Sequence, residues 1–201
     1  MSKTLEFIFD FASPNAYLAY KALPPILERT GASLEIKPCL LGGLFKATGN
    51  QAPMIAFGNV KGKMEYEQLE MQRFIAKHQL TAFKMNPHFP VNTLQLMRGA
   101  IASEMDGRLN DYIEAGLSCM WEQGLKMDDP EVYAQAMDQA GFNGQQLIER
   151  AQDPEVKAQL MANTEAAVNN GCFGIPTFFV GEEMFFGKDR LDQVEHQLGD
   201  H

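Results

Sequence analysis

The chain has 201 residues, 45% of them hydrophobic and 21% charged, so it can bury the core of one compact domain or of a domain with a sizeable insertion. Its net charge of -9 argues against nucleic acid and membrane surfaces as partners, because neither attracts a net anion. Neither a membrane-spanning run nor a signal-peptide pattern is expected. We therefore expect a small-molecule or protein partner.

The three cysteines, Cys39, Cys119 and Cys172, are odd in number and widely spaced. That spacing fits neither a disulfide framework nor a zinc site. A reducing cytoplasm is the location it favours. The four histidines show no ligand spacing, and His201 is terminal, so we expect no metal site.

The chain opens with an apolar and aromatic stretch, Leu5 to Phe11, that predicts a buried strand. A turn at Ala12-Ser13-Pro14 follows, and then a helix that runs to about Arg29. Ser13 is the expected N-cap and Pro14 the first helical residue, where its missing N–H costs nothing. This places a polar side chain at the positive end of a helix, where anions and thiolates are held.

Residues 34–40 predict a second strand, which Pro38 limits to an edge or to an early end. Residues 42–59 predict a flexible loop with one short helical turn. From 61 to about 171, apolar residues recur at three and four, which predicts helices. Two of these begin with an acidic N-cap followed by Pro, at Asp129 and at Asp153, and shared capping chemistry explains the similarity.

The last part of the chain predicts a strand over 172–180, a turn, a strand over 184–186 and a helix from Asp189 to Leu198. This order of elements is that of thioredoxin, with the insertion used by the DsbA-like branch. We therefore predict an α/β, thioredoxin-like (DsbA-like) fold. Residues 1–60 and 172–201 would form the thioredoxin-like domain, with its tail helix beginning near 153. Residues 61–152 would form an inserted all-helical domain.

Five motifs, in one order along nearly the whole chain, resemble those of the 2-hydroxychromene-2-carboxylate isomerase family, which is closely related to kappa-class glutathione transferases. They are Phe9 to Pro14, the Gly49-Asn50 loop, Lys61 to Tyr66 with Arg73 beyond it, Phe173 to Thr177, and Phe186 to Leu191. Thioredoxin-like proteins carry the first cysteine of a Cys-x-x-Cys pair at the position of Ser13. Here the four residues are Ser13-Pro14-Asn15-Ala16, so the redox pair is absent.

The resemblance implies a glutathione site on the thioredoxin fold. Ser13 would hydrogen-bond the glutathione sulfur and favour its thiolate. Ile175-Pro176 would form a cis-proline turn, where the Ile175 backbone holds the cysteinyl part. Asp189 would receive the γ-glutamyl ammonium. Lys188 stands where relatives carry Ser or Asn, and would meet the γ-glutamyl carboxylate as a point charge.

At the glycyl end of glutathione, the resemblance implies contacts from Asn50 and from Lys61 or Lys63, with Lys61 preferred. The substrate is an anion, so a cation would hold its carboxylate; Lys46, Lys61, Lys63 and Arg98 are unranked candidates. Simpler interpretations stay open for the site residues. Ser13 and Asp189 would then be helix caps, Pro176 a strand-entry proline, and the lysines solvated surface charges.

The reaction implied by the resemblance is a glutathione-dependent isomerisation of 2-hydroxychromene-2-carboxylate or a similar aromatic-derived conjugated pyruvate. The thiolate adds to the conjugated, ring-opened form, the former double bond rotates, and the thiol leaves. A kappa-like glutathione transferase or peroxidase is the nearest alternative. A DsbA-like disulfide oxidoreductase relative without redox cysteines and a binding module that has lost activity are the others. The resemblance also implies a homodimer.

Overall fold

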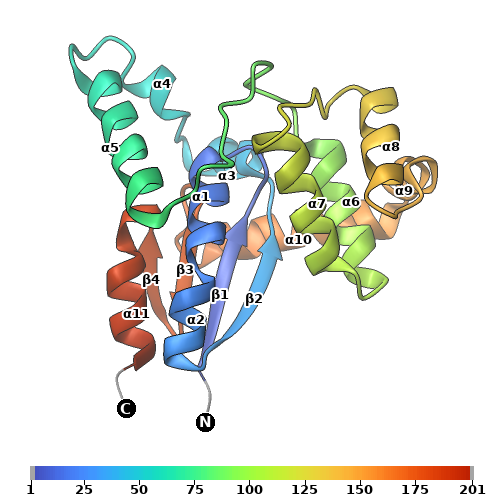
Figure 1. Cartoon of the computed structure of the whole chain (residues 1–201). Helices are drawn as coiled ribbons and strands as arrows, with labels where there is room; N and C mark the ends of the chain where they lie inside the picture. The colour runs from blue at the N-terminus through green and yellow to red at the C-terminus, as the bar shows by residue number, and fades with distance from the viewer. Residues whose placement is uncertain (1–2, 200–201) are drawn as a thin grey trace.

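The computed structural model describes residues 3–199, which form a four-stranded mixed sheet with helices on both faces (Figure 1). Helices α1, α2 and α11 lie in front of the sheet in this view, and α10 passes behind it. In chain order the elements are β1 (Thr4–Phe9), α1 (Pro14–Ala22), α2 (Pro24–Thr30), β2 (Ser33–Pro38), α3 (Leu41–Thr48), α4 (Pro53–Ala56), α5 (Lys63–His78), α6 (Leu94–Met105), α7 (Leu109–Trp121), α8 (Pro130–Gln139), α9 (Gly144–Arg150), α10 (Pro154–Asn169), β3 (Thr177–Val180), β4 (Glu183–Phe186), the 3-10 turn η1 (Lys188–Arg190) and α11 (Leu191–Gly199).

The sheet has the strand order β2-β1-β3-β4, with β1 parallel to β2 and antiparallel to β3, and β3 antiparallel to β4. This confirms the predicted thioredoxin-like order of elements. Strand β1 lies inside the sheet, and Phe7 and Phe9 on it have no exposed surface. The ring centroids of Phe7 and Phe178 on β3 are 4.7 Å apart. Burial of each such ring contributes about 1.5–3 kcal/mol, so the end of β1 that leads to Ser13 is firmly held.

Strand β2 lies at the edge of the sheet and ends at Pro38, as that proline predicted. The predicted first helix, in contrast, is two helices. Pro24 and Pro25 begin α2 and have no N–H to continue the hydrogen bonds of α1. Helix α2 ends at Gly31, whose φ of 66° is left-handed.

The prediction of a flexible loop with one short helical turn over 42–59 is wrong for residues 42–48, which belong to α3, while the four-residue helix α4 confirms the short helical turn. Gly42 and Gly43 lower the local helix propensity, but tertiary contacts override it. The carboxylate of Asp10 accepts the N–H of Leu41 at 2.7 Å, which caps the start of α3. A Cβ on Gly43 would lie 3.0 Å from a methyl carbon of Thr164 on α10. The glycine therefore allows α3 to approach α10 closely.

The helices between 63 and 150 form two groups (Figure 1). Helix α5 lies beside α11, and Lys77 of α5 pairs with Asp192 of α11 at 3.3 Å. Helices α6 to α9 form the second group, in which the hydroxyls of Tyr112 and Tyr133 are 2.9 Å apart. The bounds 61–152 of the helical insertion stay a prediction, and residues 1–2 and 200–201 of the predicted thioredoxin-like domain lie outside the described residues.

Both repeated Asp-Pro segments begin helices, as predicted. Asp129 accepts the backbone N–H groups of Glu131 and Val132 and caps α8. Asp153 stands at the N-cap of α10 without a side-chain capping hydrogen bond. The two segments therefore share a position at a helix start, while only Asp129 supplies the capping hydrogen bond.

Candidate functional site

Ser13 lies at the N-terminus of α1, directly after the end of β1. Its backbone is extended, with φ -95° and ψ 114°, and its Oγ accepts the N–H of Ala16 at 3.2 Å. The same hydroxyl donates to the backbone carbonyl of Ile175 at 3.0 Å. Ser13 is therefore a helix cap and also a direct link to the segment that precedes β3.

The Ile175–Pro176 peptide bond is cis, as the resemblance implied. The carbonyl of Pro176 accepts the N–H of Gly187 at 2.9 Å, and the hydroxyl of Thr177 donates to the carbonyl of Gly174 at 2.8 Å. Within residues 3–199 the N–H of Ile175 has no hydrogen-bond partner. The segment is thus fixed by its neighbours and keeps one backbone donor available.

Asn50 reaches this segment from the end of α3. Its side-chain amide donates to the carbonyl of Phe173 at 2.7 Å. The structure therefore brings together Asn50, Ser13 and Ile175, three residues that the sequence assigned to one site.

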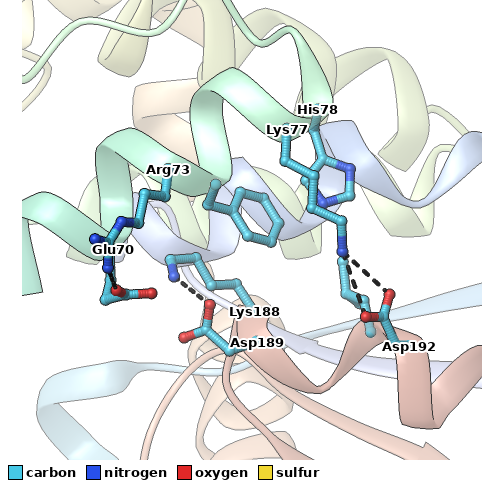
Figure 2. A pocket seen from close by; sticks show the side chains of 9 residues that line it. Glu70, Arg73, Lys77, His78, Lys188, Asp189 and Asp192 are labelled. Atoms are coloured by element: carbon cyan, nitrogen blue, oxygen red, sulfur yellow. Dashed lines mark hydrogen bonds and ion pairs between the residues drawn. The ribbon is translucent and has the colours of Figure 1, made fainter.

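Lys188 and Asp189 lie on η1, beside a cavity of about 300 Å³ between η1, α11 and α5 (Figure 2). The ammonium of Lys188 is 2.5 Å from the Asp189 carboxylate and 4.9 Å from the ring centroid of Phe74 on α5. Lys188 is 5% exposed, while the side chain of Asp189 is 59% exposed. One carboxylate oxygen of Asp189 is thus paired within the chain, and the carboxylate remains open to solvent.

The four candidate cations for the substrate carboxylate fall into two regions. Lys63 pairs with Glu67 along α5, and Lys61 is exposed in the turn before α5. Among the described residues no hydrogen bond or ion pair brings Lys61 to Ser13. Lys46 and Arg98 instead line a cavity between α3, α6 and α10. The assignment of Lys61 to the glycyl end of glutathione stays a prediction.

A buried carboxylate, Asp10, supports the turn that carries Ser13. It has no exposed surface, and it accepts hydrogen bonds from the N–H of Ala12 at 2.9 Å, the N–H of Leu41 at 2.7 Å and the hydroxyl of Thr93 at 2.7 Å. Burial raises the pKa of Asp10 to about 6, against these three hydrogen bonds, which lower it. The sequence motifs did not predict this role of Asp10. An acid between two buried aromatic residues, Phe9 and Phe11, was the available signal.

The three cysteines are all free and buried: Cys39, Cys119 and Cys172. Burial raises the pKa of Cys119 and of Cys172 to about 11 and raises that of Cys39 as well. At neutral pH these groups are thiols, so they are poor nucleophiles. Among residues 3–199 no cluster of three or more His, Cys, Asp or Glu side chains is placed to hold a metal ion.

The groups around Ser13 fit a peptide-like thiol such as glutathione. The Oδ1 of Asn15, in the first turn of helix α1, is buried and has no hydrogen-bond partner within residues 3–199. A buried acceptor without a partner costs about 1–3 kcal/mol. The available N–H of Ile175 offers one donor to a bound peptide group, and the Oδ1 of Asn15 is an acceptor without a protein partner. The N-terminus of α1 adds the positive end of a helix dipole for a sulfur anion.

The sheet order, the helix that starts at Ser13 and the cis proline opposite define a thioredoxin-like protein with serine at the usual place of the first redox cysteine. The family model of the DSBA-like thioredoxin domain matches residues 4–199. The chain therefore belongs to the DSBA-like thioredoxin family.

Two kinds of relative resemble the chain along its full length. A 2-hydroxychromene-2-carboxylate isomerase of Sphingobium xenophagum is 27% identical, over 100% of both chains. Glutathione S-transferase kappa 1 of Homo sapiens is 26% identical, over 100% of this chain and 92% of its own. A solved 2-hydroxychromene-2-carboxylate isomerase has a TM-score of 0.82 at 24% identity, over 98% of this chain and 94% of its own. These findings confirm the resemblance predicted from the motifs. In the part of the chain that the structure describes, every helix is too short or too polar to cross a bilayer.

Proposed function

We propose that the protein is a glutathione-dependent isomerase of 2-hydroxychromene-2-carboxylate or of a similar aromatic-derived conjugated pyruvate. One observation carries the proposal: the Ser13 hydroxyl, at the N-terminus of α1, lies 3.0 Å from the carbonyl of Ile175 before a cis proline. Isomerases of this name are similar to the chain over its full length, which supports the same reaction class.

Each residue of the site has a distinct part in this proposal. Ser13 turns its O–H from the Ile175 carbonyl toward the sulfur, and the helix end lowers the pKa of the thiol. Ile175 holds the cysteinyl group through its backbone. Asp189 receives an ammonium group, Lys188 a carboxylate, and Asn50 with Lys61 the glycyl end. Bound glutathione would supply a thiolate that adds reversibly to the conjugated double bond, which allows the bond to rotate.

The decisive test measures isomerisation with and without glutathione, for the wild-type protein and for Ser13→Ala. We expect activity only with glutathione, and a loss of roughly a hundredfold in kcat in the variant, as for removal of one hydrogen bond to a developing anion. Ser33→Ala, at an exposed position on β2, is the matched control and should keep full activity. Equal rates with and without glutathione would refute the proposal.

A kappa-like glutathione transferase or peroxidase is the second candidate, because relatives named kappa-class transferase are about as similar to the chain as the isomerases. Both activities use the same site. They differ in whether the adduct eliminates the thiol. Incubation with glutathione and an electrophilic aryl halide separates them, since a stable conjugate supports the transferase.

A disulfide oxidoreductase is the third candidate, supported by the fold of solved DsbA proteins, such as a probable DsbA oxidoreductase from Streptomyces coelicolor with a TM-score of 0.68 at 17% identity. The raised pKa values of the buried cysteines argue against it. Insulin reduction at the rate of thioredoxin would support it.

We also propose that the protein works as a cytoplasmic homodimer. Its buried thiols are all free, as expected in a reducing compartment. Large apolar side chains are more than 40% exposed on α4, on the following turn and on the first turns of α5, and exposed apolar surface of this kind is typical of a protein interface. They are Met54, Ile55, Phe57, Val60, Tyr66 and Leu69. Light scattering of the wild type and of Ile55→Glu tests the pairing, and a monomer in both would refute it.

A further inference from the structure

A second cavity lies where α10 passes behind the sheet and contacts α3 and α6 (Figure 1), and none of Ser13, Asn50, Ile175, Lys188 and Asp189 lines it. Its volume is about 1030 Å³, at the upper end of the range of small-molecule sites. Apolar side chains make up much of its wall: Leu40, Leu94, Leu160, Met161 and Val168. The cavity therefore has the size and the lining of a ligand site.

Three cations lie on the wall of this cavity, one from each helix: Lys46 of α3, Arg98 of α6 and Lys157 of α10. Within residues 3–199 none of the three forms a salt bridge. Elsewhere in the chain most cations are paired, as Lys21, Arg29, Lys37 and Arg150 are. The chain has a net charge of -9. Three unpaired cations around one cavity therefore give this region a positive character, opposite in sign to the charge of the whole chain.

Arg98 adds a more specific observation. Its Nε is buried and has no hydrogen-bond partner within residues 3–199. A buried guanidinium N–H without an acceptor is costly, and a carboxylate is the acceptor that its geometry suits. Among residues 3–199, Glu165 is the one acid on the wall, and it is eight residues from Lys157, which is about 12 Å along α10.

We propose that this cavity binds an organic carboxylate with an apolar body. The body lies against the leucine side chains, and the carboxylate accepts hydrogen bonds from Arg98 and Lys157. The proposal does not depend on the isomerase proposal, because no residue assigned there to glutathione lines this cavity. The common chemistry admits an aromatic acid or an aliphatic one, which the experiment distinguishes.

The test is calorimetric titration of the full chain with 2-naphthoate and with decanoate, with 2-naphthamide and acetate as probes of the body alone and the charge alone. We expect at least one of the two acids to bind tenfold or more tightly than both probes. Binding should weaken as salt rises. It should also be unchanged in Ser13→Ala and in the presence of glutathione, which keeps the two proposals distinguishable.

Two kinds of variant sharpen the test. Arg98→Gln and Lys157→Gln should each weaken the acid at least fivefold, while Lys84→Gln, at an exposed lysine outside the cavity, should not change it. Ala158→Phe, which adds bulk at the wall, should weaken the acid and the neutral probe alike. Because Lys157 is at the surface of α10, its variant stays informative if Arg98→Gln does not fold.

Three results would overturn the proposal. The first is an absence of heat with both acids. The second is equal affinity for the acid in Lys157→Gln and Lys84→Gln. The third is a change of oligomeric state in Ala158→Phe without any acid binding, which would make the cavity an interface between two copies of this chain.

Discussion

Helices α3 and α6 contribute both to the surroundings of the buried Asp10 carboxylate and to the cavity behind the sheet. The charged group in the first place has hydrogen-bond partners within the chain, whereas the cations in the second have none within residues 3–199. Asp10 accepts hydrogen bonds at the start of α3, from Leu41, and just before α6, from Thr93. One turn further along the same helices, Lys46 and Arg98 have no carboxylate partner. The first group has its polar partners within the chain, so it fixes the positions of helices. The second does not, so it is available to a ligand.

The largest effect that tests this comparison is expected in the pH dependence of stability that the charge on Asp10 causes. Its pKa in the folded protein is raised from 3.8 to about 6, so the folded state binds the proton more tightly than the unfolded state. The stability that this group contributes is therefore complete below pH 4 and is lost as the pH rises through 6. The shift corresponds to about 3 kcal/mol.

Asp10→Asn removes this titration. Urea unfolding of both proteins between pH 4 and pH 7 measures it, because other titrating groups, such as Glu6 and Glu104, are common to both and cancel in the difference. We expect the stability of the wild type relative to Asp10→Asn to fall as the pH rises through this range. A difference that does not vary with pH would contradict the role of burial at Asp10.

The next effect in size is expected at Thr93. Thr93→Val keeps the shape of the side chain and removes the donor to the Asp10 carboxylate. We expect a loss of about 2 kcal/mol in unfolding free energy, as for hydrogen bonds to charged groups. Thr81→Val, at an exposed threonine in the loop after α5, is the control and should change stability by less than about 0.5 kcal/mol. Equal losses of unfolding free energy in the two variants would show that the hydrogen bond from Thr93 to Asp10 does not stabilise the fold.

The smallest effect is expected in the cavity. Lys46→Gln and Lys157→Gln should leave the unfolding free energy within about 0.5 kcal/mol of the wild type, because neither lysine has a partner to lose. Chemical denaturation measures this. A loss of more than about 1 kcal/mol in either variant would mean that the lysine has a structural role, and the contrast with Asp10 would fail.

The sequence predicted those parts of the site that depend on local chemistry. Ser13 and Pro14 are residues typical of a helix start, and Ile175-Pro176 comes just before a strand. Both motifs therefore lie in the structure where the local sequence predicted them. The fold class followed from the order of the elements. The sequence did not predict helix α3, because the start of this helix is capped by Asp10, 31 positions before Leu41. Local helix propensity does not depend on such a distant contact.

The same reason limited the prediction of the site residues. Asp10 was visible as an acid among aromatic residues, but its partners come from two other segments. Lys61 lies in an exposed turn, where the sequence does not fix a direction for a long side chain. The cavity between α3, α6 and α10 has walls from three separated segments. Lys46 and Arg98 could be named from the sequence as candidate cations, but not as neighbours of one cavity.

The side-chain amide of Asn50, just after the end of α3, donates a hydrogen bond to the carbonyl of Phe173, two residues before Ile175. The chain continues from Asn50 directly into α4 and its exposed apolar side chains. A second copy that covered those side chains would hold Asn50 in place, and through one hydrogen bond it would also hold the backbone opposite Ser13. Self-association and the arrangement of the backbone opposite Ser13 would then depend on each other.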